Sequence, residues 1–131
     1  ARLRQAVDRA RETAPGPGRT GTLFVRTRTG IESVGLERIV AIAAAGDYSE
    51  LQLTDGRRLL HDKSLAGLER LLPAEFLRVH RAHIANMRYF IRTRGSSLEL
   101  AGETVLPVSR RRASRVLGWL RRNAPTRRPE A

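Results

Sequence analysis

The sequence contains no cysteine, few aromatic residues (three Phe, two Tyr and one Trp) and no long apolar run. The absence of cysteine excludes disulfides and thiolate metal sites and fits a reducing compartment, so we expect a cytoplasmic protein. A membrane-spanning helix needs about 20 consecutive apolar residues, which no stretch of this chain approaches. A binding surface for single-stranded nucleic acid needs exposed aromatic rings, and their scarcity argues against one.

The length of 131 residues suits one domain with a real core. Residues 1–21 combine thin helical spacing with a Pro/Gly-rich end, which predicts a connecting helix and a linker. We expect the domain itself at residues 22–123 and a flexible basic tail at residues 124–131. The chain begins at Ala1 without a visible signal peptide, and we expect it to be part of a longer protein.

The formal net charge of the whole chain is +12, and the positive charge is concentrated in its second half. From Ala1 to Glu75 there are 12 basic and 10 acidic residues, whereas from Phe76 to Ala131 there are 13 basic and 3 acidic residues. A biased genome does not sort charge into one half of a protein. The pattern therefore indicates a polyanionic partner, with nucleic acid first and an anionic membrane surface second.

The first half of the domain has the alternation and turn signals of β-structure. Within residues 22–60, Leu23 and Val25 have the alternate spacing of a strand, and Ile39 to Ala45 form a continuous run typical of a buried strand. Asp55-Gly56 marks a tight hairpin. The period then changes to that of a helix, which we expect to begin after Ser64 and to stop at Pro73.

The second half returns to β-structure and ends in a helix. We expect strands at 76–79, 83–93, 98–100 and 104–108, with a turn exposing His80 and Arg81 between the first two. Ser109 is placed to cap a final helix from Arg110 to Arg122. The sequence thus predicts a mainly β domain with one short mid-chain helix and one C-terminal helix.

Catalytic and metal sites find little support. No hydroxyl lies in a GxSxG or SxxK setting, no glycine-rich phosphate loop precedes a helix, and no acidic pair suggests acid–base catalysis. His80 and His83 are three residues apart, but on strands we expect them to point to opposite faces, and no third ligand has matching spacing. We therefore expect neither an enzyme nor a bound metal or cofactor.

Arginines provide the best candidates for binding. At an exposed turn, the planar fork of Arg81 is free to take two acceptors at once, on a phosphate or on the edge of a guanine. Arg110, Arg111 and Arg112 open the last helix, where positive charge opposes the helix dipole, so an external anion explains them. The alternative, that these arginines are ordinary solvated surface residues, stays open.

Three further residues belong to the candidate site or its surroundings. Tyr48, which follows Asp47 after a glycine, is either a contact at a loop tip or the first core residue of a strand. Asn86 lies within a strand pattern, where a structural role in local hydrogen bonding is favoured over contact with a base.

The order of motifs resembles the LytTR DNA-binding domain of bacterial transcription regulators. The mid-chain helix carries SLxxLExxL (Ser64 to Leu72), the central hairpin carries F-x-R-x-H-R-x-x-x-x-N (Phe76 to Asn86), and P-V-S-R (Pro107 to Arg110) closes the sheet before the last helix. The resemblance covers about residues 23–120. It departs from the pattern at Ala82, where many members have a serine.

The resemblance implies an elongated arrangement of small antiparallel sheets, and sequence-specific recognition of double-stranded DNA by loops in the major groove. Carried over by position, the contacts are Asp47 and Tyr48, His80 and Arg81, and Arg110, with Arg111 and Arg112 added from the charge argument. Asn86 and Ser109 are expected to support the site.

The resemblance also implies partners. Members often stand behind an upstream receiver or sensor domain, as the output domain of a response regulator. Their tandem-repeat sites suggest two copies side by side on DNA, with a homodimer as one form of this pair. An alternative from the residues alone is a β-domain that binds RNA or anionic surfaces through charge, without sequence specificity.

Overall fold

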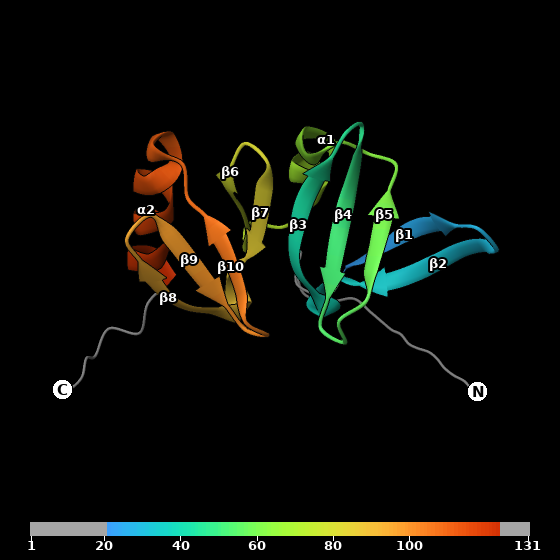
Figure 1. Cartoon of the computed structure of the whole chain (residues 1–131), viewed down its shortest axis with the longest axis horizontal. Coiled ribbons are helices and arrows are strands. Elements are labelled where there is room, and N and C mark those ends of the chain that lie inside the picture. The colour runs from blue at the N-terminus through green and yellow to red at the C-terminus, as the bar shows by residue number, and fades with distance from the viewer. Residues whose placement is uncertain (1–20, 124–131) are drawn as a thin grey trace.

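The computed structural model describes residues 21–123, which form three antiparallel sheets and two α-helices (Figure 1). The connecting helix expected within residues 1–21 and the basic tail expected at 124–131 lie outside the described residues, apart from Gly21. The predicted fold class is confirmed: small antiparallel sheets dominate, with one helix in mid-chain and one at the C-terminal end. In chain order the elements are β1 (Thr22–Thr27), β2 (Gly30–Gly35), η1 (Leu36–Arg38), β3 (Ile39–Ala45), β4 (Tyr48–Leu53), β5 (Arg58–His61), α1 (Leu65–Leu71), β6 (Phe76–His80), β7 (His83–Asn86), η2 (Met87–Tyr89), β8 (Phe90–Arg94), β9 (Ser97–Leu100), β10 (Thr104–Pro107), η3 (Arg110–Arg112) and α2 (Ala113–Asn123).

The central sheet has five strands in the order β5-β4-β3-β7-β6. Its middle strand, β3, pairs with β4 through a local hairpin and with β7 from much later in the chain. The hairpin β1-β2 and the three-stranded sheet β10-β9-β8 are separate from it. A strand covered on both faces reads as a continuous apolar run, which explains why alternation is missing from Ile39 to Ile42, the buried part of β3.

Two hydrophobic cores, which share no residue, lie against this sheet. The first joins the β1-β2 hairpin and α1 to the sheet, and the second joins the three-stranded sheet and α2 to it. A register shift between Ile39 and Ala41 lets Ile39 and Ile42 enter the first core while Val40 and Ala41 enter the second. A small domain thus buries apolar area on both faces of one sheet.

The strand predicted at residues 83–93 is wrong in one respect, because two strands in different sheets occupy it. β7 belongs to the central sheet and β8 to the three-stranded sheet, with the 3-10 turn η2 between them. Asn86 starts this turn by accepting the Arg88 N–H on its Oδ1 at 3.1 Å. The Met87 N–H donates to the Glu75 carbonyl at 2.8 Å beside the paired Phe76 and Asn86, and the chain then leaves the central sheet through η2.

The helix starts differ in how they are capped. The cap predicted at Ser64 is confirmed, since its Oγ accepts the Gly67 N–H at 3.2 Å. At Ser109 the prediction is wrong: its side chain caps nothing, and the chain first makes the 3-10 turn η3 before α2 begins at Ala113. The reason is that the Arg112 N–H, a usual partner of a capping hydroxyl, donates to the Ser109 carbonyl at 3.0 Å.

Both helices of the described part are short, and neither is long and apolar enough to cross a membrane.

Candidate nucleic-acid interface

Two of the predicted contact segments lie side by side at one end of the central sheet. The β3–β4 turn contains Asp47, and the β6–β7 turn contains Arg81. Because β3 and β7 pair with Ala43 opposite His83, both turns leave the sheet at the same end (Figure 1). The Ala44 N–H donates to the Ala82 carbonyl at 2.9 Å, so the β6–β7 turn is bonded to the end of β3 that leads into the β3–β4 turn.

The third segment, the start of η3, is tied to the same end. The Ser109 N–H donates to the Val79 carbonyl at 2.9 Å, one residue before His80. In Figure 1 the chain rises from β10 and begins its last helix at the level of the two turns. We call this surface the turn edge, defined by Asp47, Tyr48, His80, Arg81, Arg110, Arg111 and Arg112.

The β3–β4 turn presents its side chains outward. Gly46 has φ of 66° at the first central position, as in the type II′ turns that suit two-residue hairpins. Asp47 is exposed, and Tyr48 is 50% exposed although it opens β4. Burial begins one residue later, at Ser49, so Tyr48 is not the first core residue of the strand.

The β6–β7 turn is shaped by a side chain of its own. His80 Nδ1 accepts the Ala82 N–H at 3.1 Å, which leaves Arg81 exposed at the tip. Since Nδ1 is the acceptor, a neutral ring carries its proton on Nε2, which becomes a donor. The imidazole therefore supports the turn where Ala82 offers no hydroxyl.

His80 and His83 face each other, which corrects the expectation that they point to opposite faces. They are paired across the two-residue turn, and their ring centroids are 5.4 Å apart. Spacing by three on one strand separates two side chains, but across such a turn it makes them direct neighbours. Burial, with the nearby His80 adding to it, lowers the pKa of His83 and so favours the neutral form of that ring. Residues 21–123 hold no group of three His, Cys, Asp or Glu suited to a metal.

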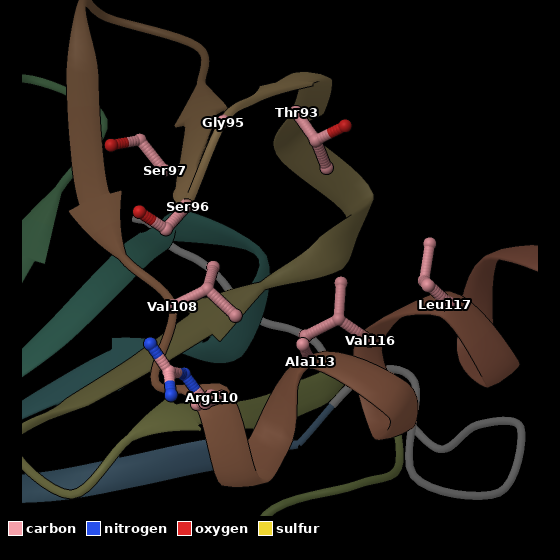
Figure 2. Close-up of a pocket in the computed structure, with 9 residues that line it drawn as sticks. All are labelled: Thr93, Gly95, Ser96, Ser97, Val108, Arg110, Ala113, Val116 and Leu117. Atoms are coloured by element: carbon pink, nitrogen blue, oxygen red, sulfur yellow. The ribbon is translucent and has the colours of Figure 1, made fainter.

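The arginines at the start of η3 have unequal surroundings. Arg110 and Arg111 are exposed, while Arg112 is half-buried. Arg110 lines a hollow of about 430 Å³ between the β8–β9 turn and α2, and Figure 2 shows it beside Val108, with Thr93 on the far side. Arg112 Nε and Ser109 Oγ are buried without a hydrogen-bond partner in the described part of the chain. Both groups lie just before α2, whose first turn is the positive end of its helix dipole.

Asn86, expected to support the site, lies at the far end of β7 from the turn. It is fully buried, and its Nδ2 donates to the Ile39 carbonyl at 2.7 Å. This hydrogen bond fastens β7 to β3, the two strands that carry the adjacent turns. Its contribution to the turn edge is therefore through the sheet rather than through contact.

Arg78 was missed by the sequence analysis, which used it only as part of a motif. Its guanidinium lies behind the β6–β7 turn, mostly buried, and donates to the carbonyls of His80 and Arg81. The sequence held one signal, because Leu77 and Val79 are core residues and an arginine between them must lie on the other side of the strand.

Comparison with known proteins gives one family and several relatives. The family model described as LytTr DNA-binding domain matches residues 29–121. Two heme-containing CO-sensing transcriptional regulators of Paraburkholderia xenovorans, RcoM 2 and RcoM 1, are 32% and 33% identical over 111 residues. The alignment covers 79% of this chain but spans only 41% of the length of each regulator.

A solved structure is similar in fold. It is the LytTr DNA-binding domain of a protein described as a methyl-accepting/DNA response regulator from Bacillus cereus, with a TM-score of 0.67 and 24% identity. The match covers 76% of this chain and 95% of the other. At this identity the likeness concerns the arrangement of strands and helices rather than individual contacts.

Proposed function

Because the chain belongs to the LytTR family of DNA-binding domains, we propose that it binds specific sequences of double-stranded DNA as part of a bacterial transcription regulator. The turn edge is the binding surface in this proposal. The observation that carries it is that three segments distant in sequence, around residues 47, 81 and 110, meet at one end of the central sheet. Exposed turns on a rigid sheet provide separate points of contact without a recognition helix.

The two turns would read bases in the major groove. The fork of Arg81 matches the N7 and O6 acceptors of guanine, and Asp47 can accept a hydrogen from the amino group of cytosine. His80, with Nδ1 occupied by the Ala82 N–H, offers Nε2–H to an acceptor such as O6 or a phosphate. Tyr48 adds a half-exposed ring and a hydroxyl beside Asp47.

The start of η3 would hold the DNA backbone. Arg110, Arg111 and Arg112 stand where the helix dipole is positive, so a phosphate compensates both the side chains and the helix end. The exposure of Arg110 and Arg111 supports this role, because a phosphate oxygen can reach their guanidinium groups from the surface. Such contacts fix the orientation of a protein on DNA without selecting a sequence.

Two copies on a tandem repeat, as a homodimer or side by side, and an upstream sensor or receiver domain complete the proposal. The upstream domain is supported by the length of the RcoM regulators, because the aligned part is only 41% of each regulator. Residues 1–21 would be the connection, and 22–123 the DNA-binding unit.

The first test is selection of bound duplexes from a random pool at near-physiological salt, where non-specific attraction to phosphates is weak. We expect an enriched motif. On that motif, Arg81→Ala should weaken the binding free energy by about 1–3 kcal/mol and relax the preference at one base pair. Arg110→Ala should instead reduce the slope of log K against log salt concentration by about one. Arg26→Ala removes an equal charge from the exposed face of β1 and serves as the matched control.

A charge-driven binder behaves differently. It would bind duplex DNA, RNA and anionic vesicles alike at one fixed salt concentration, and it would lose affinity equally in the Arg81 and Arg26 variants. That result, together with no enriched motif, would refute sequence-specific binding.

A further inference from the structure

The β6–β7 turn is held from behind by one guanidinium. Arg78 Nε donates to the His80 carbonyl at 3.2 Å, and Nη2 donates to the Arg81 carbonyl at 2.5 Å. Its Nη1 donates to Glu69 Oε1 on α1 at 2.8 Å. Each nitrogen of the fork thus has its own acceptor, and two of the three acceptors belong to the backbone of the turn.

The surroundings of this guanidinium make the arrangement rigid. The Arg78 side chain is 13% exposed, and its partner Glu69 is 35% exposed. The other Glu69 oxygen lies 3.9 Å from Arg115 Nη1 on α2, so this one carboxylate of α1 is paired with both Arg78 and the last helix. An ion pair shielded from water is screened less by salt than one on the open surface.

This turn needs such support because its own sequence provides little. Arg81 and Ala82 are its central residues, and neither is a glycine or carries a hydroxyl that would fix the loop. Apart from the bond from Ala82 N–H to His80 Nδ1, the side-chain contacts that hold the tip come from Arg78.

We infer that Arg78, anchored by Glu69, is a positioning residue that presets the turn so that His80 and Arg81 meet DNA in one conformation. The inference rests on the proposed function, since it assigns the turn to base contact. Arg78 itself does not touch DNA in this scheme, because its side chain is mostly buried and each of its three nitrogens already donates to an acceptor within the protein.

The substitution Arg78→Lys separates position from charge. Lysine keeps the positive charge but replaces the planar fork by a single ammonium group, which cannot hold two carbonyls and a carboxylate in this geometry. The turn then has to be ordered when DNA binds. The entropy lost when the backbone of one residue is fixed lowers an equilibrium constant roughly five- to thirtyfold. We therefore expect about a tenfold loss of affinity for the selected site.

Binding to an unrelated duplex should stay unchanged, because the total charge is unchanged. Arg92→Lys is the matched control, since Arg92 forms an ion pair with Glu99 at the same 2.8 Å distance but away from the turn. The variant Arg81→Ala provides the decisive background. If Arg78 acts through Arg81, then Arg78→Lys costs much less once Arg81 is absent, whereas a general structural effect would add in full.

A second measurement needs no DNA. The amide hydrogens of Ala82 and Ala44 both report on the turn, the first through His80 Nδ1 and the second through the Ala82 carbonyl. We expect Arg78→Lys to speed their exchange with solvent, while amides of the second core, such as those in β9, keep their protection. Unfolding in urea then confirms that the variant remains folded.

The outcomes separate the two proposals. Unchanged exchange at Ala82 and Ala44 together with unchanged specific affinity would overturn the role of Arg78. Additive losses in the double variant would also overturn it, because they show an effect that does not pass through Arg81. If the wild-type domain selects no DNA motif, the proposed function fails, and the exchange measurement alone still decides whether Arg78 holds the turn.

Discussion

Substitution of Asn86 by alanine is expected to destabilise the domain strongly without touching the turn edge. Asn86 is completely buried and joins two parts of the backbone. Its Nδ2 donates to the Ile39 carbonyl at 2.7 Å, and its Oδ1 accepts the Arg88 N–H at 3.1 Å. One bond fastens β7 to β3, and the other starts the turn that leads into the second sheet.

The magnitude follows from these two bonds. Each hydrogen bond contributes about 0.5–1.5 kcal/mol net, and a buried polar group that loses its partner costs about 1–3 kcal/mol. Asn86→Ala removes both bonds at once, so we expect the free energy of unfolding to fall by about 2–4 kcal/mol. A domain of this size has a total of about 5–15 kcal/mol, so the variant should remain folded at 25 °C with a clearly lower midpoint.

The assay is equilibrium unfolding in urea, followed by the fluorescence of Trp119, the single tryptophan of the chain. Asn123→Ala is the matched control, because Asn123 Nδ2 also donates to a carbonyl, that of Trp119 at 2.8 Å, but at an exposed helix end. We expect less than about 0.5 kcal/mol there. A loss below about 1 kcal/mol for Asn86→Ala, with an unchanged slope, would refute the assigned role of its hydrogen bonds.

Three further predictions concern stability. Burial lowers the pKa of His61 and of His83 below the ordinary value of 6.5, so the unfolded chain takes up protons first. The free energy of unfolding should therefore fall as the pH drops below about 6.5, and the melting temperature should be lower at pH 5.5 than at pH 7.5. His61→Gln should reduce that difference in melting temperature. An equal difference in the variant would contradict a role of His61. Ser64→Ala removes the cap of α1 and should cost about 1 kcal/mol in urea unfolding. Leu68→Ala, at a fully buried position of α1, should cost about 2–5 kcal/mol, whereas Leu71→Ala, at a position 58% exposed, should change little, and equal effects would show that the helix does not pack as described.

Local signals in the sequence were sufficient for most of the elements. Ser64 and Pro73 marked the ends of α1, and the apolar run from Ile39 to Ala45 marked the strand that became the centre of the sheet. These features depend on neighbours within a few residues, so periodicity and turn chemistry reveal them.

Features that depend on distant partners were not predictable. The pairing of β3 with β7 placed Ile84 in the central sheet, and the 3-10 turn that Asn86 begins split the strand expected at 83–93. The site shows the same limit. Arg81 was found because exposed turns are a local property, whereas Arg78 was missed because its role depends on Glu69 and on the carbonyls of the folded turn.

The pairing of β3 with β7 also has a consequence for synthesis of the chain on the ribosome. β3 and β4 emerge early, but the other edge of β3 finds its partner only when β7, which starts at His83, has been made. Neither core can be completed before that point, because the first includes Ile84 and the second includes Val116. A nascent chain that stalls before His83 therefore exposes an apolar strand edge, the feature through which incomplete chains aggregate.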